Sequence, residues 1–243
     1  MPKLRGLLFD KDGTLFDFSA SWRAVVDQTL DVLATSPGQA DEMADAVGYL
    51  RQEGRFLPGS VIVAGSVDAF AAIWAEFRPD LGAGRIEEIA NLIVEDAVSG
   101  GALAPAVPDL RGLMLGLRSN GFQLGIATHD SESAARDQVS RHGALDCFSF
   151  IAGYDSGHGL KPGPGMMHAF CAATGLHPSE CAMIGDSVHD LGVAPASGAA
   201  LAIGVLTGPA EHADLAHMAD HVIGSIGELP ELLMRLGHLS DSV

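Results

Sequence analysis

The chain has 243 residues, of which 47% are hydrophobic and 19% are charged. This apolar share can fill the core of one large domain or two modest ones, and it excludes a chain that stays unfolded. The 31 acidic residues outnumber the 14 basic ones and give a formal charge of −17. Such a surface repels nucleic acid phosphates and anionic membranes, so we expect neither as a partner. The sequence has no run of about 18 uncharged apolar residues, so we expect no membrane span.

The N-terminal segment and the cysteines bear on location. The first apolar stretch ends at Asp10, which is too short for the apolar part of a secretory signal peptide, and we expect none. Cys147, Cys171 and Cys181 are odd in number and lack the spacing of metal ligands or of a redox pair. Buried, reduced thiols fit this pattern, so we expect a cytoplasmic protein.

Residues 4–9 form a short apolar run that predicts a buried strand ending at Asp10. Over residues 16–99 the pattern is helical instead, because apolar residues recur there at the spacing of a helix turn. Ser19 and Pro37 stand at expected helix starts. This segment contains no convincing strand, apart from a doubtful run at 61–64. Its helices are expected at residues 19–33, 37–53, 66–77 and 85–98.

From Pro105 onward, expected strands and helices alternate, which is typical of a parallel sheet covered by helices on both faces. We therefore predict an α/β fold with a doubly wound parallel sheet, formed by residues 1–15 and 100–243. Residues 16–99 are expected to form a small inserted helical domain. The further strands are expected at 122–128, 147–152, 181–185 and 200–205, and the helices at 109–119, 131–142, 164–174, 188–197 and 226–236.

Polar residues stand directly after several of these strands. In parallel sheets, ligands bind beyond the carboxyl ends of the strands. We therefore expect the side chains at these positions to meet at one edge of the sheet. They are Asp10, Asp12, Thr128, Asp186 and Asp190.

The segment Asp10-Lys-Asp-Gly-Thr-Leu carries the strongest chemical signal. Two carboxylates stand two residues apart, just before Gly13, whose backbone can turn the chain sharply. One carboxylate can act as a nucleophile while the other acts as general acid and base. The alternative is a surface turn, and the apolar strand directly before it argues against that.

A second acidic pair lies in Gly185-Asp-Ser-Val-His-Asp. Asp186 follows an expected strand, and Asp190 lies one helical turn further on the same face. Carboxylates that converge on Asp10 and Asp12 would repel one another unless a hard cation such as Mg²⁺ lay between them. The alternative is a helix-capping aspartate, which fits Asp190 better than Asp186.

Lys161 is the one lysine beyond residue 11. Pro162 disfavours helix at Lys161 and stiffens the loop that carries it. A positioned ammonium can neutralise both a phosphate and a neighbouring aspartate. An ordinary surface lysine is the alternative. Thr128 offers a hydroxyl for a phosphate oxygen.

Taken in order, these segments resemble the four motifs of the haloacid dehalogenase-like (HAD) hydrolase superfamily. They are Asp10-Lys-Asp-Gly-Thr, Thr128, Lys161-Pro and Gly185-Asp-Ser-Val-His-Asp. The resemblance spans the whole chain. The helical insert after the first motif looks like the small α-helical cap of the phosphoglycolate phosphatase-like branch.

The resemblance implies a role for each motif residue. Asp10 would be the nucleophile that forms an aspartyl-phosphate, and Asp12 would protonate the leaving alcohol and then activate water. Thr128 and Lys161 would hold the phosphoryl oxygens. His129 stands where the family commonly has asparagine, and we keep it as a candidate phosphate contact. Mg²⁺ would be bound by the carboxylates of Asp10 and Asp186 and the main-chain carbonyl of Asp12, with Asp190 in support.

The expected activity is Mg²⁺-dependent hydrolysis of a small phosphomonoester, with 2-phosphoglycolate as one candidate. Asp12 argues against dehalogenases, which replace this residue, and the insert lacks the lysine of the phosphonate-cleaving branch. A β-phosphoglucomutase-like sugar-phosphate mutase stays open, as does a catalytically silent binding module. Substrate choice would fall to the insert, where Arg55 and Arg23 could bind a substrate carboxylate or simply face solvent. The sequence leaves the oligomeric state open.

Overall fold

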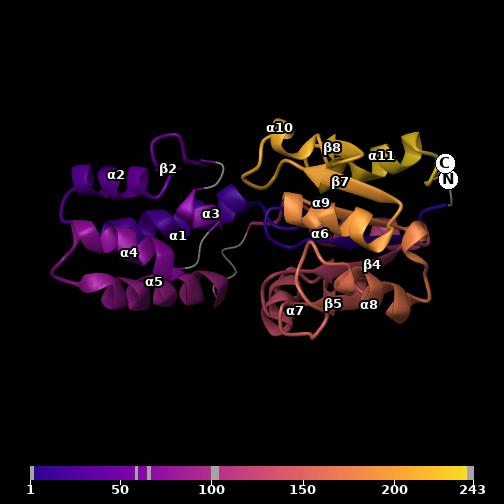
Figure 1. Cartoon of the computed structure of the whole chain (residues 1–243), viewed down its shortest axis with the longest axis horizontal. Coiled ribbons are helices and arrows are strands. Elements are labelled where there is room, and N and C mark those ends of the chain that lie inside the picture. The colour runs from indigo at the N-terminus through magenta and orange to yellow at the C-terminus, as the bar shows by residue number, and fades with distance from the viewer. Residues whose placement is uncertain (1–2, 58–59, 65–66, 100–103, 240–243) are drawn as a thin grey trace. The chain divides into compact units, whose positions relative to one another are not determined.

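The computed structural model describes residues 3–57, 60–64, 67–99 and 104–239 (Figure 1). The chain divides into two compact units. Met1–Asp17 and Pro105–Val243 form one, which we call the core unit, and Phe18–Ala104 form the other, which we call the insert. The boundary expected at residue 100 lies outside the described residues. Within the described part of the chain, no helix combines the length and the apolar character needed to cross a membrane.

The core unit is built on a six-stranded sheet with the order β5-β4-β1-β6-β7-β8. Every neighbouring pair in this sheet is parallel, which confirms the expected α/β fold. The last strand, β8, was not expected, because it has three residues and begins with a histidine. The strands are β1 (Gly6–Phe9), β4 (Gln123–Ala127), β5 (Phe150–Ala152), β6 (Cys181–Gly185), β7 (Leu201–Val205) and β8 (His221–Ile223).

The register of the central strands places their carboxyl ends side by side. Phe9 at the end of β1 is opposite Ile126 in β4 and Ile184 in β6. The residues that follow these three strands therefore emerge at the same edge of the sheet. This register brings Asp10, Thr128 and Asp186 together, although they are far apart in the sequence.

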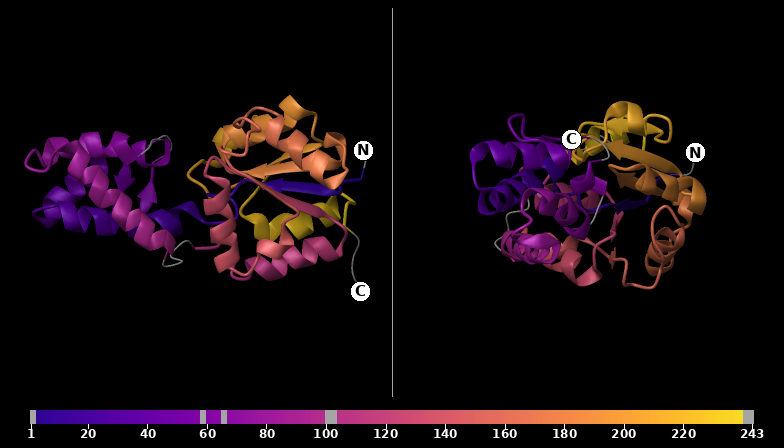
Figure 2. Two further views of the ribbon diagram at one scale, coloured as in Figure 1. Left: turned by 90° about the horizontal axis from the view of Figure 1, so that it is seen from below. Right: turned by 60° about the vertical axis from the view of Figure 1, so that its left-hand side comes forward.

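Helices cover both faces of the sheet, with α8 and α9 on one face and α6 and α11 on the other (Figure 2). A buried apolar cluster joins Phe170 of α8 and Leu191 of α9 to the strand residues Leu8 and Met183. The helices of the core unit are α6 (Leu110–Ser119), α7 (Glu132–Arg141), α8 (Gly165–Thr174), α9 (Val188–Ser197), α10 (His212–Leu215) and α11 (Leu229–Arg235).

The insert is helical, with one two-stranded hairpin. Its core surrounds Trp74, which is fully buried and whose indole Nε1–H donates a hydrogen bond to the Met43 carbonyl at 2.9 Å. The helices are α1 (Phe18–Leu33), α2 (Pro37–Ala46), α3 (Val61–Ala64), α4 (Val67–Phe77) and α5 (Gly82–Ser99), and the strands are β2 (Tyr49–Leu50) and β3 (Arg55–Phe56).

Two expectations about the insert were wrong. The helix expected over 37–53 ends at Ala46, because Gly48 adopts a positive φ of 77° and turns the chain into the β2–β3 hairpin. The doubtful strand at 61–64 is the short helix α3.

Two elements of the core unit begin later than expected. A 3₁₀ turn over Leu145–Cys147 delays β5 to Phe150. Another over Ile226–Glu228 precedes α11. Turns of this kind have a helical spacing but too few residues for a periodicity argument to place their ends.

Candidate active site

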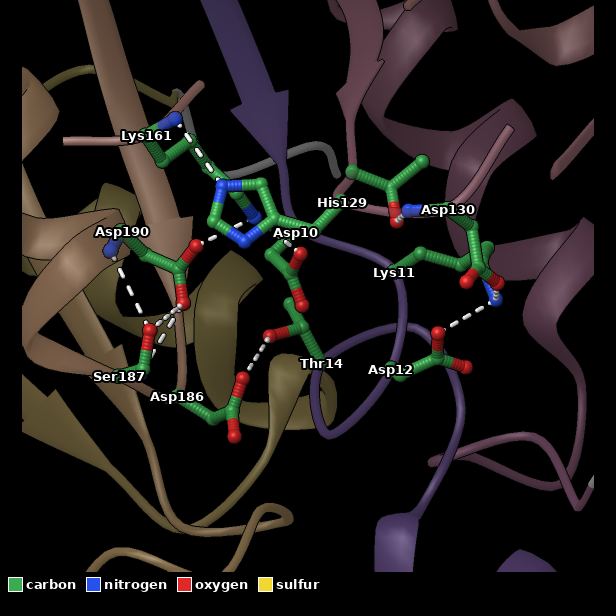
Figure 3. A network of polar contacts seen from close by, with 11 residues as sticks. Asp10, Lys11, Asp12, Thr14, His129, Asp130, Lys161, Asp186, Ser187 and Asp190 are labelled. Atoms are coloured by element: carbon green, nitrogen blue, oxygen red, sulfur yellow. Dashed lines mark hydrogen bonds and ion pairs between the residues drawn. The ribbon is translucent and has the colours of Figure 1, made fainter. Parts of the chain in front are cut away.

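Three buried carboxylates meet at the carboxyl edge of the sheet (Figure 3). Asp10 follows β1, Asp186 follows β6, and Asp190 lies in the first turn of α9. One carboxylate oxygen from each lies within 4.8 Å of the other two, and all three residues are buried. The expected convergence of these side chains is therefore observed.

Lys161 supplies positive charge to this cluster. Its Nζ forms an ion pair with Asp10 Oδ1 and lies 2.6 Å from Asp190 Oδ1. The lysine is buried, so the alternative of an ordinary surface lysine is wrong. Its main-chain N–H donates a hydrogen bond to His129 Nε2 at 3.0 Å, which fixes the loop against the segment after β4.

Asp190 combines two functions that the sequence left as alternatives. Ser187 caps α9, and its N–H and O–H both donate to Asp190 Oδ2, at 3.0 and 2.5 Å. The other oxygen, Oδ1, faces Lys161. The helix cap therefore orients the same carboxylate that joins the acidic cluster.

Asp186 fits into a space that two glycines leave open. A Cβ at Gly13, whose φ is 82°, would lie 2.4 Å from Asp186 Oδ2, and one at Gly208 would lie 1.9 Å from it. Real side chains do not pack at such distances, so both positions require glycine. The hydroxyl of Thr14 lies 3.5 Å from Asp186 Oδ1 and donates to it.

The side chain of Asp12 does not join the three carboxylates, so the expectation that it would converge with them was wrong. It points to the other side of the turn after β1, where its Oδ2 lies 2.6 Å from the Nζ of Lys11 (Figure 3). The side chain keeps 29% of its surface exposed, in contrast to 9% for Asp10. The contact expected between its main-chain carbonyl and the metal stays a prediction.

Thr128 and His129 lie beside the cluster with different surroundings. Thr128 is buried, and its hydroxyl accepts a hydrogen bond from the Asp130 N–H at 3.1 Å. His129 is exposed, and its Nε2 already accepts the Lys161 N–H. The phosphate contacts expected for both residues stay predictions.

Arg23 and Arg55 lie in the insert and are both exposed. Arg55 forms an ion pair with Glu53 at 3.2 Å. Arg23 packs on Gly54 in the β2–β3 turn, where an added Cβ would lie 2.6 Å from its guanidinium. The exposed setting fits the solvated-surface alternative, and a role in substrate choice stays a prediction.

The acidic cluster carries more negative charge than Lys161 can balance. Burial, opposed by the charge of Lys161, raises the pKa of Asp10 to about 7. Burial and then the charges of Asp10 and Asp190 raise the pKa of Asp186 well above its ordinary value. Burial opposes the charge of Lys161, but Asp10 and Asp190 outweigh this effect and raise the pKa of Lys161. A bound cation would offset the repulsion among these carboxylates, and an all-oxygen donor set suits Mg²⁺.

Three residues near the site had no expected role from the sequence: Lys11, Asp130 and Gln138. The structure joins all three to Asp12 in a second ionic cluster on the far side of the turn after β1. One signal was present in the sequence, since Lys11 is one of three lysines and stands between the two aspartates of the first motif. Its partners come from other elements and could not be read from the sequence.

Residues 4–198 match the family model of the haloacid dehalogenase-like hydrolases. The match covers most of the chain, and the chain belongs to this hydrolase family. The core sheet with its helical insert agrees with the fold that the resemblance implied.

Phosphoglycolate phosphatases are among the curated relatives of similar length. That of Cereibacter sphaeroides is 29% identical over 232 residues, which cover 95% of this chain and 98% of that protein. That of Yersinia pseudotuberculosis is 30% identical and covers 94% of this chain and 95% of that protein.

Solved structures share the fold over the whole chain. A HAD family hydrolase from Deinococcus radiodurans, with bound phosphate and sodium, has a TM-score of 0.73 at 18% identity, with full coverage of both chains. A β-phosphoglucomutase from Clostridium difficile has a TM-score of 0.60 at 15% identity, with 97% coverage of each chain. At these identities the likeness shows the fold alone.

Proposed function

We propose that this hydrolase is a Mg²⁺-dependent phosphatase that acts on a small phosphomonoester, with 2-phosphoglycolate as the first candidate substrate. The observation that carries this proposal is the cluster of Asp10, Asp186 and Asp190, whose oxygens lie within 4.8 Å of one another beside the buried Lys161. The curated phosphoglycolate phosphatases that align with nearly the whole chain support the choice of substrate.

The donor set fits the proposed metal. The carboxylates of Asp10 and Asp186 and the main-chain carbonyl of Asp12 would hold Mg²⁺, with Asp190 in support. When bound, the ion would neutralise charge on the phosphoryl group and on the carboxylates around it. Burial, and then the neighbouring carboxylates, raise the pKa of Asp186, and burial raises that of Asp10 to about 7, so a bound cation would stabilise the ionised forms of both groups.

The reaction would proceed in two displacements at phosphorus. A carboxylate oxygen of Asp10 attacks phosphorus, and the bond to the alcohol oxygen breaks while Asp12 donates a proton to that oxygen. Asp12 then takes a proton from water, which attacks the aspartyl-phosphate, and inorganic phosphate leaves with Asp10 regenerated. Lys161 and the hydroxyl of Thr128 would hold the phosphoryl oxygens during both steps.

A panel of phosphorylated metabolites tests this proposal. The chain is incubated with Mg²⁺ and each compound, and released inorganic phosphate is measured. We expect release from small phosphomonoesters, with the highest kcat/KM for 2-phosphoglycolate. Absence of release from every compound, including 4-nitrophenyl phosphate, would contradict the proposal and leave the silent binding module.

A sugar-phosphate mutase is the second candidate, because the fold that the chain shares with a β-phosphoglucomutase is compatible with both reactions. A mutase returns the phosphoryl group to a second hydroxyl of the sugar. Incubation with β-glucose 1-phosphate distinguishes the two, because a mutase forms glucose 6-phosphate while a phosphatase forms glucose and inorganic phosphate.

The proposed location is cytoplasmic, which fits the burial of all three cysteines as free thiols.

A further inference from the structure

We propose that Lys11 is a positioning residue, which holds the Asp12 carboxylate in the orientation needed for proton transfer to the leaving group. It lies in an ionic cluster with Asp12, Asp130 and Gln138, in which Lys11 and Gln138 are buried and the two aspartates are partly exposed. This inference rests on the proposed phosphatase function, in which Asp12 is the general acid.

The ammonium of Lys11 is held from three sides. Its Nζ lies 2.6 Å from Asp12 Oδ2, 2.9 Å from Asp130 Oδ2 and 2.5 Å from Gln138 Oε1. An ammonium has three N–H donors, so these contacts use its full capacity. The partners come from the turn after β1, the loop after β4 and helix α7. Lys11 is therefore fixed in place and has no donor left for a phosphate oxygen.

Burying the Lys11 side chain removes its charge from water, which opposes folding. Lys11 is 1% exposed and Gln138 is 4% exposed, although lysine and glutamine are among the residues least often buried. Two carboxylates, those of Asp12 and Asp130, lie at ion-pair distance from the Lys11 Nζ and compensate the buried charge. An apolar residue of similar volume would often stabilise such a place equally well.

The two buried lysines serve different aspartates. Lys161 contacts Asp10 and Asp190, whereas Lys11 contacts Asp12 on the opposite side of the turn (Figure 3). The Nζ of Lys11 donates to Oδ2 of Asp12, which keeps this carboxyl group out of the acidic cluster and at a partly exposed position. The proton for the leaving group would be carried on the other oxygen, Oδ1. A general acid needs this arrangement, because it must reach the leaving oxygen while the nucleophile holds phosphorus.

If the general acid is poorly positioned, the loss of rate depends on the basicity of the leaving group. Proton donation matters most for a basic leaving group and least for one that departs readily as an anion. Phenyl phosphate and 4-nitrophenyl phosphate share their shape, but phenolate is the more basic leaving group. Loss of Lys11 should therefore reduce cleavage of phenyl phosphate more than cleavage of 4-nitrophenyl phosphate.

The test uses Lys11→Met in the full chain with Mg²⁺, and it measures kcat/KM for both aryl phosphates. This parameter reports formation of the aspartyl-phosphate, the step in which the leaving group departs. We expect a decrease of about 10²-fold for phenyl phosphate and of less than about 10-fold for 4-nitrophenyl phosphate. Equal losses on both substrates, or no loss on either, would overturn the proposal.

Dependence on Asp12 provides the second measurement. If Lys11 acts through Asp12, adding Lys11→Met to Asp12→Asn should change kcat/KM for phenyl phosphate by less than about 2-fold. If Lys11→Met lowers kcat/KM in the Asp12→Asn chain by as large a factor as it does when Asp12 is intact, the proposal is overturned. Gln138→Leu is the matched control, because it removes one partner but keeps the ion pair, and we expect the same leaving-group preference with a smaller effect.

Folding is checked by thermal melting of each variant. If Lys11→Met does not fold, Asp130→Asn replaces it, because this partner is half exposed and lies outside the packed core. We expect the same preference with Asp130→Asn, and its absence would overturn the proposal. Failure of the proposed function is distinguishable, because the unmodified chain would then release phosphate from neither aryl ester, and both proposals would fall together.

Discussion

The core unit and the insert differ in where they place charged side chains. Among the described residues, five charged side chains are buried in the core unit and none is buried in the insert. The insert instead holds its ion pairs near the surface, as between Arg51 and Asp27 at 3.0 Å. The buried residues of the core unit are Asp10, Lys11, Lys161, Asp186 and Asp190.

This difference indicates what each unit gains from its charges. Burying a charge removes it from water, which opposes folding unless the partners compensate. The core unit retains this unfavourable arrangement where phosphoryl transfer is proposed to need it. Removing the charge of one of these buried residues should therefore impair activity, whereas breaking a surface ion pair of the insert, such as that of Arg51, should change only stability, by a small amount.

Asp10→Asn should give the largest effect on activity. The amide cannot form the aspartyl-phosphate, and we expect kcat for phosphate release to fall by about 10⁴-fold or more. The melting temperature in EDTA should stay equal or rise, because one buried carboxylate charge is gone. Asp137→Asn is the matched control, since Asp137 is exposed on α7. Retention of more than about a tenth of the activity would remove Asp10 from the nucleophile role.

Lys161→Met should come next. It removes the cation that contacts Asp10 and Asp190, and we expect kcat/KM to fall by about 10²- to 10³-fold. Stability at pH 8 should also fall, because the buried carboxylates lose their partner. Arg85→Met removes an exposed ion pair with Glu88 in the insert and should leave both properties unchanged. Equal effects of the two substitutions would contradict the contrast between the units.

Metal removal should make the stability of the chain depend on pH. The pKa of Asp10 rises from 3.8 to about 7 in the folded protein, so the folded state binds this proton more tightly than the unfolded state does. The resulting stabilisation is complete below about pH 3.8 and is lost as the pH rises through about 7. In EDTA the melting temperature should therefore fall between pH 5 and pH 8, and Mg²⁺ should flatten this slope. The opposite slope in EDTA would contradict the assigned direction.

Arg51→Gln in the insert should give the smallest effect. Arg51 donates to Asp27 and Asp31 but keeps 22% of its side chain exposed, so solvent screens both interactions. We expect a loss of about 1 kcal/mol or less in the free energy of unfolding. Turnover of 4-nitrophenyl phosphate should stay within about 2-fold of the unmodified chain. Chemical denaturation measures the free energy of unfolding, and a phosphate-release assay measures the turnover. A large loss of turnover would contradict the proposed difference between the two units.

Much of the core unit could be predicted, because its signals are local and its topology is restrictive. The residues 181–185 and 188–197 have the bounds of β6 and α9, which an apolar run and a capped helix define. A parallel sheet then places the strand ends at one edge, so the meeting of Asp10 and Asp186 followed without any knowledge of contacts.

Other features could not be predicted, because they depend on partners that are distant in the sequence. The role of Lys11 depends on Asp130 and Gln138, which reach it only after α7 packs beside the turn. The hairpin in the insert depends on a backbone reversal at Gly48 inside a stretch with helical spacing. The outward orientation of Asp12 could not be read from its two-residue spacing to Asp10.

The loop after β7 contributes to the site through the absence of a side chain at Gly208, which leaves room for the Asp186 carboxylate. The hydroxyl of Thr207 donates to the Gly13 carbonyl at 2.7 Å, which ties this loop to the turn after β1. A methyl group on Gly208 would collide with the carboxylate at 1.9 Å. The loop therefore shapes the wall of the site by leaving space, and even alanine there would displace Asp186 while every proposed reacting group remained in the sequence.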